Sequence, residues 1–471
     1  MPGPPPINVS INSLVSLLQT RLGDSGTFWN AAELALYVRQ AIREFQVLTN
    51  YWRARVDLTT TALSAFYDLH ATGAIPYTVE DTDSLNQVGY HLLEYDGSQD
   101  APINTLQFSI NALSAALDQR REEILGESRL VVTEYAGNAP GPPPPSGTIQ
   151  LSSGVIQIHR VEWLDLSGST ALTWAQLVEQ WQNLNIPWDQ LVSGVVWSLV
   201  SRTDEIGGYG WSYGWAQTPA AVPTGYSVAA ARPFVVQFIP GPTNTGYASI
   251  LITACNPYTY TPGTPQLLGI PDDAAFALPW GIMASMLSQD AQSRDYRRAT
   301  YAQQRFRQAL EVLKTWPCVM NTYPGGIQYP PSTLFALDHW QAGWRNQAPA
   351  LPAVVAVAGR NLVACSPVPD QQYLIAMDCV VNSPASGVAS ANFSMAGDIV
   401  TAILDNAYHL AAFKLQGEEW EATMPLYQEF LTCAKENADR ARAQSINWEA
   451  LLGVTAEETA EVPYEAEKVE A

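Results

Sequence analysis

Ile270-Pro-Asp-Asp-Ala-Ala-Phe-Ala-Leu-Pro-Trp-Gly-Ile-Met-Ala-Ser-Met-Leu287 is the stretch that decides the fold. Its large apolar side chains recur at helical spacing, and the same spacing returns after a polar patch and ends at Pro317. The two stripes are Phe276, Trp280, Met283 and Leu287, then Phe306, Ala309, Leu313 and Trp316. This spacing predicts helices that each bury one face. Pro279 lies inside the first stripe, so we expect either a kink or a helix break there.

Two N-terminal segments are also predicted to be helical. The first covers residues 11–22 and stops at Gly23, the residue type that most readily takes a left-handed helix cap. The second begins at Asn30, which Glu33 follows three residues later as in a capping box. Its apolar residues alternate steps of four and three: Leu34, Val38, Ala41, Phe45, Leu48 and Trp52. Such a seam packs against a helix of another chain or against the core of its own chain.

Strand signals dominate from Val155 to Ala254, where β-branched and aromatic residues gather in short runs. We therefore predict a small antiparallel β domain. Its last two strands, residues 233–239 and 248–254, flank a turn-rich connector and are expected to form a hairpin. Residues 56–69 and 354–381 predict further strands. The Pro-rich stretch 139–145 predicts an extended loop that faces solvent.

The remaining helical segments are residues 105–126, 398–416 and 419–443. Together these patterns predict an α+β fold, a helical bundle with inserted antiparallel β-rich domains. The expected parts are residues 1–127, N-terminal helices and strand of the bundle; 128–269, a β-rich domain; 270–317, core bundle helices; 318–394, a second β-rich segment; 395–452, a C-terminal helix pair and docking segment; and 453–471, a flexible acidic tail.

Composition favours a protein that works in an assembly. Apolar residues make up 47% of the 471, charged residues only 15%, and there are 15 Trp and 21 Tyr. Soluble globular proteins average roughly 25% charged residues, and association surfaces lose charge while gaining Trp and Tyr. A large aromatic core inside one chain explains the same composition equally well.

The charge balance argues against a protein that binds nucleic acid directly. The chain has 24 basic and 45 acidic residues, a net charge of -21, whereas non-specific nucleic-acid affinity comes from basic side chains on phosphates. An acidic wall is nevertheless compatible with DNA that passes through a channel without sticking. The start of the chain lacks the features of a signal peptide, and the longest near-apolar run, residues 276–287, is too short to cross a membrane.

No catalytic or metal motif is supported by its surroundings. Gly210-Trp-Ser-Tyr-Gly fits the G-x-S-x-G pattern with Ser212 as nucleophile, but the strand before it and the helix after it are not indicated. Asp81-Thr-Asp-Ser starts like a calcium loop yet lacks the required glycine and glutamate, so we interpret it as a polar turn. We expect no cofactor, structural histidines with satisfied ring nitrogens, and cysteines that are buried free thiols. These residues are His70, His91, His159, His339 and His409, and Cys255, Cys318, Cys365, Cys379 and Cys433.

A resemblance to a known family enters at residues 233–314. The hairpin-like pair is followed by Ile270-Pro-Asp-Asp, Ala277-Leu-Pro-Trp-Gly, and Asp295 with Arg298, Ala299, Tyr301 and Arg305. This order resembles the adaptor, or head-to-tail connector, proteins of tailed bacteriophages. The runs Val38 to Phe45 with Tyr51-Trp, and His409 to Trp420 with Pro425 to Phe430, are also similar, so that the likeness covers roughly half of the chain.

The resemblance implies a structural virion protein of the neck, assembled in the host cytoplasm and without enzymatic activity. It implies a homo-oligomeric ring of about twelve copies, closed by a repeated heterologous interface. The expected partners are the portal protein and tail or nozzle proteins, with DNA passing through the channel and no membrane contact. The alternative is a decoration protein that binds host glycan through the aromatic loop 209–215, and a serine hydrolase is a third reading.

Each matched residue also has a plain physical role. Asp272 or Asp273 can cap the helix after Ile270-Pro271, Gly281 beside Trp280 permits close helix approach, and Asp295 can pair with Arg298 one turn later. These are interface or structural candidates.

Arg298, Tyr301 and Arg305 share one flank of a helix, which predicts a surface open to solvent or to an adjacent subunit. Near the C-terminus, Trp448, Leu451 and Leu452 are further candidates that either dock on a neighbour or pack back on the parent helices.

Overall fold

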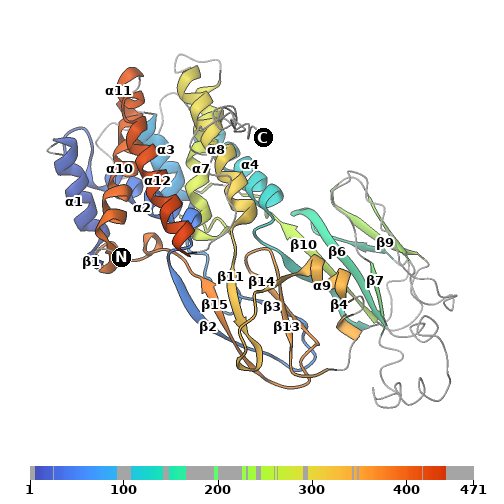
Figure 1. Ribbon diagram of the computed structural model, residues 1–471. Coiled ribbons are helices and arrows are strands. Elements are labelled where there is room, and N and C mark those ends of the chain that lie inside the picture. The colour runs from blue at the N-terminus through green and yellow to red at the C-terminus, as the bar shows by residue number, and fades with distance from the viewer. Residues whose placement is uncertain are drawn as a thin grey trace, which may run out of the picture.

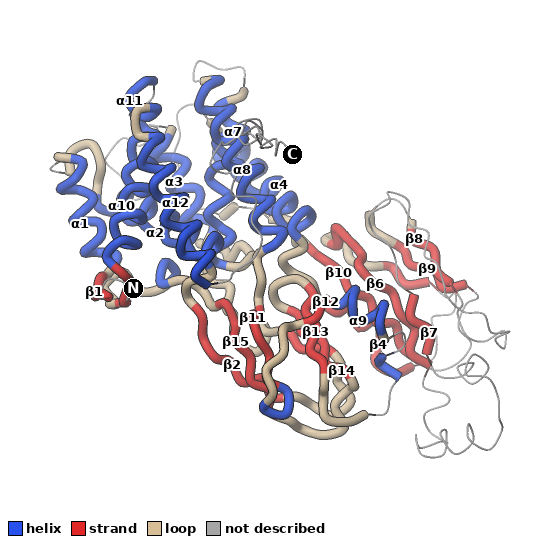
Figure 2. The backbone as a smooth tube through the Cα atoms, in the orientation of Figure 1, coloured by secondary structure: helices blue, strands red, loops and turns tan. Residues whose placement is uncertain are grey.

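Helices and strands separate in space, with the helices gathered at one end of the molecule and most strands at the other (Figures 1 and 2). This arrangement, seen in a computed structural model, confirms the expected α+β fold. The structure describes residues 6–24, 26–92, 108–141, 148–165, 196–199, 225–229, 232–239, 246–258, 260–261, 264–289, 295–341, 344–346, 349–415 and 417–441. The tail expected at 453–471 lies outside these residues.

The bundle consists of α1 (Ile11–Leu22), α2 (Ala31–Thr49), α3 (Asp81–His91), α4 (Ile110–Ser128), the 3-10 turn η1 (Asp272–Phe276), α7 (Ala277–Leu287), α8 (Tyr296–Thr315), α10 (Gly397–Ala412), η5 (Phe413–Leu415), α11 (Gly417–Glu421) and α12 (Met424–Ala441). The predicted caps are present, because the Asn30 side chain accepts from the Glu33 amide at 2.8 Å and Gly23 closes α1 at φ 65. Sequence patterns therefore located the principal helices well.

α2 is enclosed by other helices of the same chain. Its predicted seam is buried from Leu34 to Leu48, but Gln40, Glu44 and Gln46 on its other sides are buried as well. The helices α1, α3, α10 and α12 surround it, so the seam packs within the chain and the alternative of a seam against another chain is wrong for this helix. Trp52 lies beyond the helix end.

α7 occupies the middle of the bundle, and ten of its eleven residues are buried. The chain forms a 3-10 turn up to Phe276, and the α-helix begins at Ala277. Pro279 thus falls in the first turn of α7, where its missing N–H would have no helical partner anyway. In place of the expected kink or break, a 3-10 turn passes directly into the α-helix two residues before Pro279.

Two antiparallel sheets form the β domain. Their strands are β4 (Thr133–Gly141), β6 (Val155–Asp165), β7 (Val196–Leu199) and β10 (Gly246–Ala254) in the order β4-β10-β6-β7, and β5 (Thr148–Gln150), β8 (Gly225–Val228) and β9 (Val235–Ile239) in the order β5-β9-β8. The hairpin predicted from 233–239 and 248–254 is wrong, because β9 and β10 belong to different sheets. β10 already pairs with β4 on one edge and β6 on the other, which leaves no edge for β9.

The second β part combines strands from both ends of the chain. It contains β2 (Arg53–Thr59), β11 (Val319–Tyr323) and β15 (Leu374–Val380) in the order β11-β15-β2, and β3 (Phe66–Asp68), β12 (Ser332–Thr333), β13 (Val354–Ala358) and β14 (Leu362–Ser366) in the order β12-β13-β14-β3. The segment 56–69 is therefore two strands in two sheets, and both pair with strands of the segment 318–394. The short helix α9 (Leu334–Trp340) follows β12.

The turn between β13 and β14 joins the helical bundle to the β sheets. The fully buried Arg360 donates to the carbonyl of Pro317, just after α8, at 2.7 Å and to that of Val380 at 2.9 Å. The Asn361 side chain forms two 2.9 Å hydrogen bonds with the backbone of Val132 at the entry to β4. These bonds fix the β sheets to the bundle.

Two elements differ from the sequence interpretation. Asp81-Thr-Asp-Ser is the first turn of α3, and the polar turn predicted there is wrong. The Asp81 carboxylate accepts hydrogen bonds from Tyr258 and from the Gln266 amide, which anchors the helix start. Of the Pro-rich stretch 139–145, residues up to Gly141 continue β4, and the rest lies outside the described residues.

Candidate functional site

The residues that carry the family resemblance meet in the interior of the bundle. Ile270, Pro271, Asp272, Trp280, Gly281, Arg298 and Arg305 are all buried. Tyr301 is partly buried and packs against the core, and Asp295 sits at the start of α8. The surface predicted along Arg298, Tyr301 and Arg305 is therefore wrong, because α10, η5 and α2 cover this flank of α8.

Arg305 forms an ion pair with Glu44 of α2, and both side chains are almost fully buried. One guanidinium nitrogen donates to both carboxylate oxygens of Glu44 at 2.9 Å. The guanidinium lies over the Tyr427 ring at 3.7 Å from its centre and over the Trp280 ring at 4.7 Å. Burial disfavours the charged guanidinium and is the largest single effect, but Glu44, Tyr301 and Tyr427 together outweigh it and raise the pKa of Arg305.

The carboxylate of Glu44 has two further partners from the C-terminal helices. Asn406 of α10 donates to it at 3.0 Å, and the Tyr427 hydroxyl of α12 at 3.1 Å. A buried charge is tolerated when it is paired and its remaining acceptor positions are filled. Glu44 thus ties α2 to α8, α10 and α12.

His409 extends this network through Tyr301. Its two ring nitrogens lie 2.7 Å from the Tyr301 hydroxyl and 2.7 Å from the Thr423 hydroxyl, and Arg305 donates to Tyr301 at 2.9 Å. Burial, with the nearby Arg305 charge, lowers the pKa of His409 to about 3. The imidazole is neutral at ordinary pH. We call Glu44, Tyr301, Arg305, His409 and Tyr427 the polar core.

His91 departs from the expectation that the histidines are satisfied. It is fully buried, and neither ring nitrogen has a hydrogen-bond partner among the described residues. The ring stacks on Tyr37 at 4.8 Å. Burial first, and then the positive charges of Arg298 and Lys414, hold its pKa well below the usual range.

Arg298 and Asp295 behave as predicted toward each other. Asp295 is the N-cap of α8, with one carboxylate oxygen accepting from the Arg298 amide at 3.1 Å and the other from its guanidinium at 2.8 Å. The same guanidinium also donates to the carbonyls of His91 and Phe413 at 3.3 Å. Arg298 therefore joins the ends of α3 and α10 to the start of α8.

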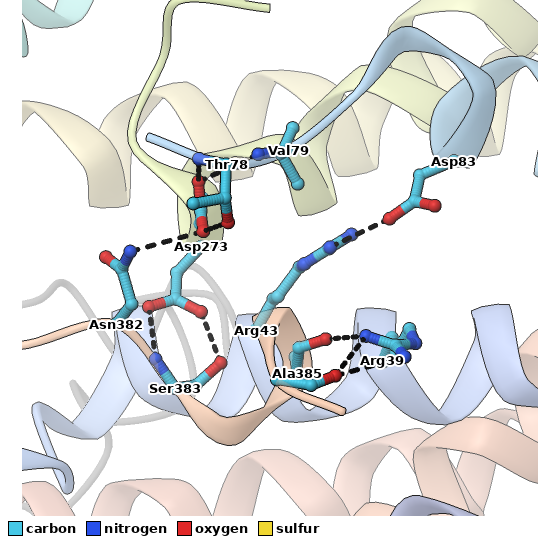
Figure 3. Close-up of polar contacts among 11 residues, drawn as sticks. Arg39, Arg43, Thr78, Val79, Asp83, Asp273, Asn382, Ser383 and Ala385 are labelled. Atoms are coloured by element: carbon cyan, nitrogen blue, oxygen red, sulfur yellow. Dashed lines mark hydrogen bonds and ion pairs between the residues drawn. The ribbon is translucent and has the colours of Figure 1, made fainter. Parts of the chain in front are cut away.

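Asp272 and Asp273 connect three segments of the chain. Figure 3 shows Asp273 facing Ser383. Asp272 accepts from the Thr78 amide and hydroxyl at 2.5 Å and from the Val79 amide at 3.0 Å. Asp273 accepts from the amide and the hydroxyl of Ser383. The predicted helix cap is wrong, since η1 has no side-chain cap and both carboxylates are engaged elsewhere.

Burial raises the pKa of Asp273 to about 6, although hydrogen bonds from Ser383 and the charges of Arg360 and Arg43 oppose the rise. Arg43 itself pairs with Asp83 of α3 at 3.0 Å, and Arg39 donates to the carbonyls of Ala385 and Gly387 (Figure 3). The loop after β15 is thus held to α2 and η1 by several independent polar contacts.

Gly281 has the predicted role of allowing close packing. A Cβ atom there would lie 2.9 Å from ring carbons of Phe306 and 2.9 Å from the Cγ of Arg120. α7 therefore approaches both α8 and α4 as closely as its backbone permits.

Sequence reasoning missed the partners of the charged motif residues. Glu44 was not singled out, and neither was the buried pair in which Lys414 donates to Glu33 at 3.1 Å. Both carboxylates lie on α2 among apolar residues. One sequence signal could have pointed to Glu33 and Glu44. Each is a charged residue in a helix that carries apolar side chains on every face.

Among the described residues, no group of three or more His, Cys, Asp or Glu side chains could hold a metal ion, and no helix could span a membrane. None of the five cysteines, which all lie among the described residues, forms a disulfide. Four are buried, as expected, and Cys433 is half-buried. Ser212, the aromatic loop 209–215, Trp448, Leu451 and Leu452 lie outside the described residues.

An open cavity of about 620 Å³ lies between α4 and β6. Glu122, Glu123, Glu127, Arg120 and Arg232 supply its charged lining. Glu122 pairs with Arg232 at 2.6 Å and Arg120 with Glu123 at 2.7 Å. Among the described residues its lining has no Ser, Cys or His side chain.

No family model matches this chain, and no curated protein matches it. Function therefore has to be inferred from the residues and the fold. The motif residues meet one another at the centre of the bundle, where they hold the helices in place.

Proposed function

We propose that the chain is a structural virion protein, the subunit of an adaptor ring that joins the head of a tailed bacteriophage to its tail. The observation that carries the proposal is the structural role of the adaptor-like residues. All of those between Ile270 and Arg305 serve to fasten α7 and α8 to the rest of the bundle. A ring that transmits force between head and tail needs such rigidity.

The polar core supports a mechanical role rather than a chemical one. Arg305 is paired, stacked and enclosed, and His409 is held neutral between two hydroxyl groups. Neither side chain is accessible to a substrate. Breaking such a buried pair is costly, roughly 3–5 kcal/mol, and that cost opposes relative movement of the four helices that share it.

The charge of the chain supports a channel for DNA. A net charge of -21 repels phosphate, and long-range repulsion keeps a duplex from adhering to the wall. In this proposal about twelve copies form the ring, the portal protein meets one rim and tail or nozzle proteins meet the other. Enzymatic activity and a cofactor have no place in it.

The proposal is tested by measuring the mass of the purified chain alone and after mixing with purified portal protein. We expect a complex in which about twelve copies of the chain sit on one portal ring. A chain that stays monomeric in both settings contradicts the proposal, and so does ester hydrolysis that is lost in Ser212→Ala.

A further inference from the structure

One side of the bundle has no charged side chain of its own. Residues 6–20 contain no Asp, Glu, Lys or Arg, and neither do residues 384–396. β1 (Pro6–Val9) pairs with β16 (Phe393–Ala396), and the Asn12 amide donates to the Ala389 carbonyl at 3.1 Å. The two uncharged stretches therefore form one continuous surface, which we call the uncharged face.

The uncharged face lies at the edge of the molecule farthest from the β domain. Figure 1 shows α1 and β1 at the left, with the sheets of the β domain at the right. α1 packs on α2 and α10 through Leu14 and Leu18, and its other side is open. That open side presents Ser13, Ser16 and Leu17.

Two charges at the border of this face are engaged within the chain, whereas Asp398, two residues after β16, is exposed. Arg39 comes from α2 and donates to the carbonyls of Ala385 and Gly387. Arg21, at the end of α1, forms an ion pair with Asp405. Elsewhere the bundle exposes carboxylates, for example Glu122 and Glu127 on α4, so the lack of charge is local.

Large apolar side chains project from the uncharged face. Val388 is 72% exposed, Leu17 50% and Ile7 43%. Interfaces between proteins lose charged residues at their centre and keep apolar ones. Leu17 and Val388 come from the two different stretches, so the apolar character belongs to the face as a whole.

We propose that the uncharged face packs against a second copy of this chain. Two copies that each carry a net charge of -21 repel wherever carboxylates meet, so a contact between them requires a surface without charge. A basic partner would gain nothing from this face, and the acidic surfaces elsewhere would suit it better. The inference rests on the proposed ring and names the side on which neighbouring subunits touch.

The strands of this face offer a second kind of contact. Among the described strands β1 pairs only with β16, so the outer edge of each is not paired in a sheet. Unpaired strand edges template pairing with another chain. A neighbouring copy can thus add main-chain hydrogen bonds to the apolar contacts of Leu17 and Val388.

The experiment introduces one charge on the face and measures the assembly of the full chain by sedimentation and native mass spectrometry. We expect Leu17→Glu and Val388→Glu to raise the dissociation constant between copies by at least roughly tenfold, since each places an unpaired charge in an otherwise uncharged contact. Leu17→Gln, which is polar but uncharged, should weaken assembly less. Leu63→Glu is the matched control, because Leu63 is 73% exposed and follows β2 in the other half of the molecule.

The outcomes separate the inference from the proposed function. If the wild type forms the ring and both glutamate variants form it equally well, the uncharged face is not the contact and the inference fails alone. If the wild type forms only a dimer that Leu17→Glu dissociates, the face is a contact but the ring is contradicted. A wild-type chain that is monomeric at every concentration, with and without portal protein, overturns both. Unchanged circular dichroism and thermal unfolding identify the variants that remain folded.

Discussion

Arg305 of α8 and Glu44 of α2 are 261 residues apart in the chain and form a buried ion pair at 2.9 Å. The pair is enclosed by aromatic rings and shares its carboxylate with Asn406 and Tyr427. Low surrounding polarity strengthens the attraction and also makes an unpaired charge costly. The helices of the bundle are therefore held in one arrangement by a contact that no neighbouring residues in sequence could provide.

Removing one partner of this pair should destabilise the fold strongly. We expect Glu44→Ala to lower the free energy of unfolding by roughly 3–5 kcal/mol, because Arg305 is left charged and buried. Urea denaturation followed by circular dichroism measures the change. Arg297→Ala removes the exposed pair with Glu421 and should cost less than about 1 kcal/mol. Equal effects of the two variants would show that the buried pair is not what holds the helices.

Close packing at Gly281 predicts sensitivity to a single methyl group. Gly281→Ala places a Cβ atom 2.9 Å from the Phe306 ring, and we expect a loss of roughly 1–3 kcal/mol despite the better helix propensity of alanine. Gly397→Ala, at the start of α10, meets no atom within 4 Å and serves as control. Thermal unfolding of the two variants compares them. A Gly281→Ala protein as stable as wild type would contradict the close approach of α7 to α8.

Asp273 predicts a particular pH dependence of stability. Its pKa is raised to about 6 in the folded protein, above the ordinary value of 3.8, so the folded state holds a proton that the unfolded state has lost. Stability from this group is complete below the ordinary pKa and is lost as pH rises through about 6. The loss is on the order of 3 kcal/mol.

Asp273→Asn tests this dependence, because an amide cannot titrate. Its free energy of unfolding relative to wild type should rise between pH 4 and pH 7, measured by urea denaturation at each pH. Asp24 is the comparison, since hydrogen bonds from backbone amides, Trp29 first, lower its pKa. Asp24→Asn should therefore change in the opposite direction, and only below the ordinary pKa of 3.8, with no change between pH 4 and pH 7. A pH-independent difference for Asp273→Asn would refute the buried, partly protonated carboxyl.

Much of the helical part of the fold is predictable from local sequence. The caps at Asn30 and Gly23 and the pairing of Asp295 with Arg298 follow from chemistry within three or four residues, and the structure contains each of them. The hairpin predicted at 233–254 is wrong. Adjacency in sequence favours pairing, but both edges of β10 are already paired, with β4 and with β6. The strand pairing of β2 with β15 joins residues more than 300 positions apart, and no local pattern contains it.

The polar core was only half visible in the sequence. Arg298 and Arg305 were identified, but their charge suggested an exposed flank, because charged side chains are rarely buried without a partner. The partners that permit burial, Glu44 and the carbonyls of His91 and Phe413, come from other segments. Only the three-dimensional arrangement shows that these charges are paired inside the bundle.

Cryo-electron microscopy of the neck of the virus particle tests the central claim most directly. The account predicts a closed ring of about twelve copies between portal and tail, each with its helical bundle packed as described around α2 and α7. A neck without density for this bundle, in particles that contain the full complement of structural proteins, would contradict it.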